Sequence, residues 1–191
     1  MRWERLFADL ETELAAAEAA ERDVEVAERT RAEVAKLRLV DRLRVAGEAS
    51  LTVELAGVGS WAGRVVDTGP DWVLLRGDPR GDALVALDAV RTVSGLPPRS
   101  AVPGSEGRVA ERFRIGAVLR GVARDRAGVQ VWVRDGRTHA GTVDRVGADY
   151  LELAEHEPDL PRRTAAVRGV CLVPFAALAA VVVSPQVPRH R

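Results

Sequence analysis

The chain has 191 residues, 47% of them hydrophobic, with 28 basic and 28 acidic side chains, so it can bury a core and carries no formal net charge. A balanced charge gives no general reason to expect a nucleic-acid or membrane partner, and a single cysteine, Cys171, excludes a disulfide within one chain. Neither a run of about 18 apolar residues nor the apolar core of a signal peptide is present, so we expect a cytoplasmic protein.

The first segment, residues 1–48, is predicted to form a long helix or a helical hairpin. Residues 2–46 contain neither glycine nor proline and are rich in Ala, Glu, Arg and Leu, which favour helix. Apolar residues recur there at heptad spacing, and four of them form a candidate self-association surface: Leu6, Leu10, Leu14 and Ala17. The pattern fits packing on the rest of the chain, a coiled coil with a second copy or another protein, or a hairpin that bends near residues 22–23.

Two later segments, residues 49–95 and 128–184, are predicted to consist of short antiparallel strands. Apolar and polar residues alternate in them, and no helix separates one strand from the next. Between these segments lie a linker rich in proline and glycine and a predicted helix, at residues 96–107 and 108–127. The second strand segment also contains an inserted loop, and a loose tail follows it, at residues 154–169 and 185–191.

The two strand segments repeat one pattern. When the first is shifted by 78 positions, Gly63 lies on Gly141 and the alternation of the two segments stays in step. Ten additional residues then enter the second copy, after which "LVALDAV" (84–90) lies on "LVPFAAL" (172–178) at a shift of 88. An internal duplication explains these matches better than chance does. The residues expected to form the two cores are Val53, Leu55, Val65, Val73, Leu75, Val131, Val133, Val143, Leu151 and Leu153.

The stretch "VQVWVRDGRTHAGTVDRVGADYLEL" (129–153) resembles the first motif of the Sm-like family, which includes the Sm proteins and Hfq. The similarity rests on the alternating valines, the Asp-Gly turn and Gly141 at the start of the second strand. "ALDAVRTVS" (86–94) resembles the closing strands of that family. The resemblance implies an α+β, mostly β fold with two tandem, small, bent five-stranded antiparallel β-barrels, each preceded by a helix.

The RNA-binding residues of that family are absent from both copies. The positions that match its Asp, aromatic and Asn read Gly147, Asp149 and Leu151 in the second copy, without the asparagine that contacts a base. The positions that match its Tyr-Lys-His run read "ALD" (86–88) and "PFA" (174–176). The resemblance therefore implies an inherited fold without the RNA pocket.

No catalytic motif is present, so we expect a protein that is not an enzyme and that uses neither a cofactor nor a metal. The chain lacks a phosphate-binding loop, a nucleophile elbow and zinc-finger spacing. His139 is expected to face solvent, and Cys171 is expected to be a small core residue. We therefore expect a binding or assembly module that acts on protein partners or a second copy through its edge strands and N-terminal helix.

The main alternative is a regulator that binds RNA or DNA through an arginine-rich segment, residues 108–126. Residues 96–128 contain seven arginines against three acidic side chains, a local net charge of +4. A third possibility is an accessory subunit of an enzyme. The candidate contacts for nucleic acid or an acidic partner are Arg108, Arg112, Arg120, Arg124, Arg162 and Arg163.

Overall fold

The structure is a computed structural model, and it describes residues 2–105, 113–156 and 169–183. The chain divides into two compact units, Met1–Arg38 and Leu39–Arg191. In the described ranges, no helix combines the length and the apolar character needed to cross a lipid bilayer.

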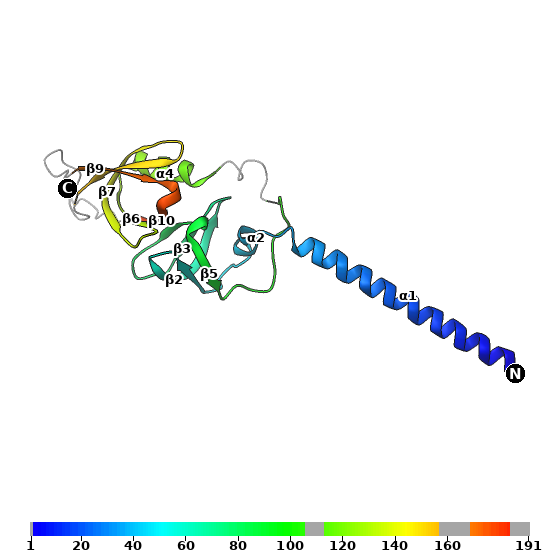
Figure 1. The fold of residues 1–191 in the computed structure, drawn as a ribbon. Coiled ribbons are helices and arrows are strands. Elements are labelled where there is room, and N and C mark those ends of the chain that lie inside the picture. The colour runs from blue at the N-terminus through cyan, green and yellow to red at the C-terminus, as the bar shows by residue number, and fades with distance from the viewer. Residues whose placement is uncertain (1, 106–112, 157–168, 184–191) are drawn as a thin grey trace. The chain divides into compact units, whose positions relative to one another are not determined.

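The first unit is a single helix, α1 (Arg2–Val34), which is 33 residues long (Figure 1). It runs through residues 22–23 without interruption and ends before Ala35, so the helix stops well short of residue 46. An ion pair one turn apart, between Arg29 and Glu25 at 2.9 Å, supports the exposed surface of the helix. The helix therefore follows from composition and local charge pairs.

The second unit contains two further helices and ten strands in the part that is described (Figure 1). The helices are α2 (Leu39–Arg44) and α4 (Ile115–Asp125). The strands of the first half are β1 (Leu51–Leu55), β2 (Gly59–Thr68), β3 (Trp72–Arg76), β4 (Ala83–Ala86) and β5 (Val90–Ser94). Those of the second half are β6 (Gly128–Val133), β7 (Thr138–Val146), β8 (Tyr150–Glu155), β9 (Gly169–Pro174) and β10 (Leu178–Val183).

All ten strands belong to one open antiparallel sheet, in the order β5-β1-β2-β3-β4-β10-β6-β7-β8-β9. The expectation of two separate closed five-stranded barrels is therefore wrong. The physical reason is the free edge of β4, whose unpaired backbone groups favour pairing with another strand. Strand β10 takes this place, with Val85 opposite Ala180, so the hydrogen-bonded ladder continues from one half into the other instead of closing on itself.

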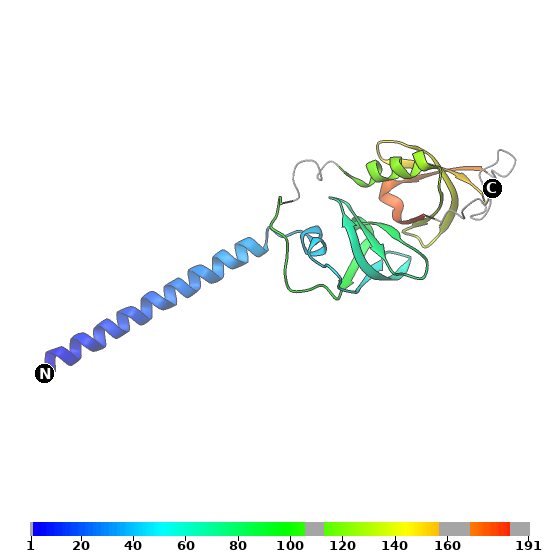
Figure 2. The same ribbon diagram turned by 180° about the vertical axis from the view of Figure 1, so that it is seen from behind.

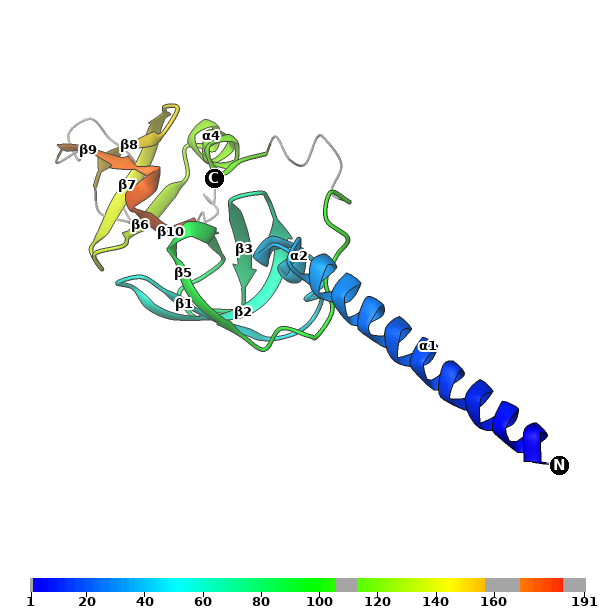
Figure 3. The ribbon, with the colours of Figure 1, turned by 45° about the vertical axis from the view of Figure 1, so that its right-hand side comes forward.

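The two halves, whose strands Figure 3 shows from another side, nevertheless share one strand order. The first half has the order β5-β1-β2-β3-β4, and the second half has the matching order β10-β6-β7-β8-β9. The 3₁₀ turns Leu87–Ala89 and Phe175–Ala177 occupy equivalent places. In each turn the first N–H donates to a matching carbonyl, that of Asp71 at 2.9 Å and that of Asp149 at 2.7 Å. The duplication read from the sequence is thus visible in individual hydrogen bonds.

Nine of the ten expected core residues are buried, which confirms the alternation that predicted them. The tenth, Val65, is partly buried and packs against the first-half core. Two apolar clusters form, and each contains buried residues from both halves. Trp132 packs against both clusters, and Ala180 and Val182 of the second half are buried in the cluster that holds most of the first-half core.

Helix α4 packs on the second half but is fixed at its start by the first half (Figure 2). The N–H of Ile115 donates to the carboxylate of Asp71 at 2.9 Å, which satisfies one of the free donors at the helix start. The indole N–H of Trp72 donates to the carbonyl of Phe113 at 2.7 Å. The first half therefore sets where α4 begins, although residues 106–112, part of the helix predicted at 108–127, lie outside the described residues.

Candidate functional site

Only part of the predicted arginine surface can be placed. Arg108, Arg112, Arg162 and Arg163 lie outside the described residues. Arg120 and Arg124 are exposed on α4, and a guanidinium nitrogen of Arg120 donates to the carbonyl of Gly147 at 3.3 Å. These two residues face water, but Arg120 also holds α4 to the turn before β8.

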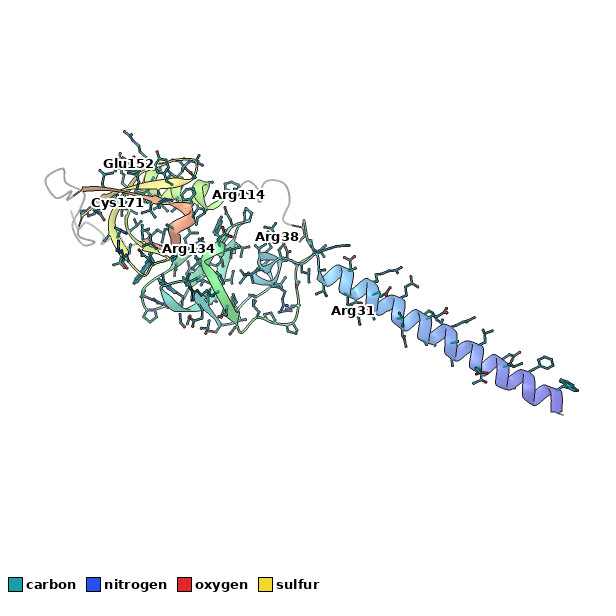
Figure 4. The ribbon with its side chains drawn as sticks, in the orientation of Figure 1. Arg31, Arg38, Arg114, Arg134, Glu152 and Cys171 are labelled. Atoms are coloured by element: carbon teal, nitrogen blue, oxygen red, sulfur yellow. The ribbon has the colours of Figure 1, made fainter. Side chains whose placement is uncertain are left out.

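The other basic side chains near α4 have acidic neighbours. Arg114 lies 4.0 Å from the carboxylate of Asp71, and Arg126 lies 3.5 Å from that of Asp144. Figure 4 labels Arg114 at the start of this helix. Ion pairs of this exposed kind contribute little to stability, but they reduce the positive charge available to a phosphate. The described part of the segment is therefore less basic than its arginine count indicates.

The apolar stripe of α1 is open to solvent within its own unit. Leu10 and Leu14 are 52% and 63% exposed, and Ala17 is also exposed, whereas the side chain of Leu6 lies outside the described part. Two aromatic residues of the same helix, Trp3 and Phe7, are 71% and 60% exposed. Trp3, Phe7, Leu10 and Leu14 follow one another at intervals of four, three and four residues, which is the spacing of a coiled-coil seam. This spacing could have identified Phe7 from the sequence.

The sheet has two outer edges, β5 and β9, on which the described residues place no further strand. On β9, Val170 and Leu172 are 57% and 58% exposed, which is unusual for two large apolar side chains on one short strand. On the opposite edge, β5 presents Arg91, Thr92 and Ser94 to solvent. Exposed strand edges are templates for pairing with another chain.

The internal joint between β4 and β10 shows how such edges meet in this fold. Three residue pairs form the ladder: Ala83 with Val182, Leu84 with Val181, and Val85 with Ala180. All four residues of β4 are buried, as are the first five of β10. Burial of apolar residues on both strands makes this joint part of the protein core.

Two tryptophan side chains and an arginine side chain pack on one another beside the paired strands β4 and β10. Trp132 from β6 meets Trp61 from β2 edge to face, with ring centroids 6.0 Å apart. The guanidinium carbon of Arg80 lies 3.6 Å from the centroid of the Trp61 ring. Arg80 is held by Asp78, whose carboxylate accepts from its Nε at 2.8 Å. The hydrogen bonds from Arg80 lower the pKa of Asp78 to about 2.

The duplication relates the joint to the free edges. A shift of 88 residues places Ala83, in β4, on Cys171, in β9, and places Val182, in β10, on Ser94, in β5. Strand β9 is therefore the second-half counterpart of β4, and β5 is the first-half counterpart of β10. Each chain thus uses one copy of each joining strand internally and leaves the other copy at an edge.

Two residues for which the sequence predicts no function, His139 and Cys171, have side-chain atoms within 4.8 Å of each other. His139, on β7, is only partly exposed, and its Nδ1 lies 2.7 Å from a carboxylate oxygen of Glu155 on β8. Cys171, on β9, is partly buried against the second-half core. Burial, and then the negative charge of Glu155, raise the pKa of the Cys171 thiol. His139 is therefore not a simple solvent-facing residue.

No family model, no curated protein and no solved structure matches this chain.

Proposed function

We propose that the protein is a non-catalytic assembly module whose copies join edge to edge, with β9 of one copy pairing with β5 of the next. The observation that supports this proposal most directly is the pairing of β4 with β10, because these strands are the equivalents of β9 and β5 and they already pair within one chain. The resemblance to the Sm-like family supports the proposal, because members of that family join their neighbours through such edges.

The duplication gives the register of the proposed contact. Each residue of β4 corresponds to the residue 88 positions later, in β9, and each residue of β10 corresponds to the residue 88 positions earlier, in β5. Applied to the three residue pairs between β4 and β10, this correspondence defines three pairs between copies. They are Thr92 with Val173, Val93 with Leu172, and Ser94 with Cys171. Pro174 in β9 has no N–H to donate to such a ladder. Its first-half counterpart is Ala86, which has no partner in β10, so we expect no pair at the proline and no interruption of the three-pair ladder.

The duplication also predicts which side chains lie beside the proposed contact. In the internal joint, Trp132 meets Trp61. The shift of 78 residues places Glu54 at the position of Trp132 and His139 at the position of Trp61. A joint of the same geometry between two copies brings an acidic side chain of one copy to a histidine of the other.

An edge-to-edge contact of this kind is head to tail, because the two surfaces that meet are different. Repeated contacts of this type close into a ring or continue as a filament, depending on the rotation between copies. The stripe on α1 formed by Trp3, Phe7, Leu10 and Leu14 provides a second contact, which we assign to a coiled coil with another copy. The large exposed area of this stripe is the driving force for that contact.

Sedimentation velocity of the full chain over a range of concentrations tests the proposal. We expect wild-type protein to form oligomers as its concentration rises. A double variant, Val170→Lys and Leu172→Lys, places charges on the free edge and should weaken assembly by about tenfold or more, since two exposed apolar contacts are lost. Leu10→Glu with Leu14→Glu should remove only the contact made by the helix.

Val102→Lys is the matched control, because Val102 is a large apolar residue that is 71% exposed in the linker and belongs to neither edge strand. It should assemble as the wild type does, and all variants should show the same thermal unfolding midpoint. A wild-type protein that stays monomeric at every concentration contradicts the proposal. Assembly that is unchanged in the edge variant contradicts the assignment to β9.

A second function, nucleic-acid binding, draws support from the exposed arginines on α4, Arg120 and Arg124. Its contact would be with phosphate, because the base-contacting asparagine of the Sm-like family is absent and Asp71 is engaged in capping α4. Binding by this route would be independent of base sequence and would weaken steeply with salt.

A further inference from the structure

Three side chains with different metal-binding groups converge on one face of the second half. They are His139 on β7, Glu155 on β8 and Cys171 on β9, three adjacent strands of the sheet. One ligand atom from each lies within 4.8 Å of those of the other two. The His139 Nδ1 and a Glu155 carboxylate oxygen are in direct hydrogen-bond contact at 2.7 Å. Figure 4 labels Cys171 on its strand.

We propose that His139, Glu155 and Cys171 bind a zinc ion. This assignment goes beyond the proposed assembly and does not depend on it, because all three ligands belong to one chain. Zinc is bound in proteins by imidazole nitrogen, carboxylate oxygen and thiolate sulfur at about 2.0–2.3 Å. A set that mixes sulfur and nitrogen with a single oxygen suits zinc and does not suit magnesium or calcium, which take oxygen ligands.

The sheet register explains why the three groups can meet. Glu155 is paired with Gly141 on one side and with Gly169 on the other. His139 precedes the first glycine by two residues and Cys171 follows the second by two, so both share the face of Glu155. Because its two direct neighbours have no side chains, space remains beside Glu155. A Cβ at Gly169 would already lie 4.0 Å from the Glu155 carboxylate.

The equivalent positions of the first half show that the fold itself does not require these groups. His139 corresponds to Trp61, Glu155 to Gly77 and Cys171 to Ala83, and none of these offers a metal ligand. Trp61 and Ala83 are fully buried apolar residues. Where the first half uses apolar packing, the second half therefore has three metal-binding groups.

Access and charge also fit a metal ion. The side chains of His139 and Glu155 are 26% and 36% exposed, so an ion can enter from solvent and a water can fill the remaining position. On binding, the Cys171 sulfur forms a bond to the metal and its proton is released to solvent. The ion then separates the thiolate from the Glu155 carboxylate and offsets the repulsion between these two negative charges.

Calorimetric titration of the chelator-treated full chain with zinc alone tests the proposal. We expect one ion per chain with a micromolar or tighter Kd. Cys171→Ser, His139→Ala and Glu155→Gln should each weaken binding by at least about tenfold, since losing even an outer partner of a metal ligand has an effect of that size. Glu152→Gln is the matched control on the same strand, β8, and should bind as the wild type does (Figure 4).

Two further readouts separate a zinc site from a change in folding. Cobalt bound in place of zinc should give the thiolate-to-metal absorption in the near ultraviolet, and Cys171→Ser should abolish it. Zinc should also slow alkylation of Cys171 in the folded protein by at least tenfold. The proposal is overturned if zinc binds only in the millimolar range, or if the three ligand variants, each shown to be folded by circular dichroism, bind as tightly as the Glu152→Gln control.

Discussion

Replacing Gly141 with alanine tests whether the close approach of β7 to β8 depends on a missing side chain. A Cβ at this position would collide with the backbone carbonyl of Ala154 on β8, at a separation that real Cβ atoms do not reach. The obstacle is backbone in the middle of a paired ladder, with Thr142 opposite Ala154, so no side-chain rotation relieves it. The strand must move, and the ladder between β7 and β8 must distort.

The expected cost is about 2–3 kcal/mol, at the upper end of the range for overpacking a well-packed interior, because the clash is with backbone. The equivalent change Gly63→Ala should be similar, since a Cβ there would lie 2.5 Å from the Arg76 carbonyl. Urea unfolding followed by circular dichroism measures both losses of stability. Each variant should unfold at a lower urea concentration, with an unchanged dependence of the unfolding free energy on urea.

Gly121→Ala in α4 is the control, because a Cβ at that helical position meets nothing within 4 Å. It should stabilise the protein by about 0.5–1 kcal/mol through helix propensity. If Gly141→Ala is as stable as the wild type, the close approach of β7 and β8 does not exist in solution, and its equivalence to the close approach at Gly63 is lost.

Three other outcomes follow from the structure. Because the pKa of Asp78 is lowered to about 2 from 3.8, its stabilising contribution is complete above pH 3.8 and is lost as the pH falls through about 2. Asp78→Asn should lower the free energy of unfolding by roughly 1–2 kcal/mol at neutral pH, measured by urea unfolding. Val131→Ala, at a fully buried position, should cost about 1–3 kcal/mol in the same assay. Uridine- and adenine-tract oligonucleotides should show no sub-micromolar binding that persists in higher salt, and fluorescence anisotropy that detects such binding would refute the absence of base readout.

The strands, the core and the duplication could be predicted because they depend on local pattern. Alternation in "LTVEL" and its match to "VQVWV" predicted which side chains point inward, and the buried pattern of β1 follows that alternation. Glycine at 63 and 141 marked two close strand approaches for the same reason. These features require no knowledge of which strands meet at a distance.

The joining of the two halves could not be predicted in the same way, because the choice of partner for a free edge is a matter of tertiary structure. One signal was present in the sequence. Strand β4 reads "ALVA" and β10 reads "LAAVVV", and neither contains the alternating polar residues of a strand with one solvent-exposed face. Continuous apolar runs are typical of strands buried on both faces, which both of these are.

The groups at the candidate sites were missed because each comes from a different strand. His139, Glu155 and Cys171 are separated in the chain by two stretches of 16 residues, one of which contains the inserted loop. Only the register of β7, β8 and β9 brings them together. The stacking of Arg80 on Trp61 likewise joins a turn to a strand 19 residues earlier, and no motif predicts it.

A disulfide trap across the proposed contact tests the central claim most directly. Ser94→Cys places a thiol on β5 opposite the native Cys171 on β9 of the next copy, at the Cα separation of about 4.5–5.5 Å that paired antiparallel residues and disulfides share. Within one chain these two strands lie at opposite ends of the sheet, with eight strands between them. Oxidation in the presence of a chelator should therefore give a reducible ladder of covalent oligomers. Ser105→Cys, at an exposed position in the linker, should give none above background. A Ser94→Cys protein that stays monomeric on oxidation, or that forms the ladder equally well when Cys171 is replaced by serine, contradicts edge-to-edge assembly.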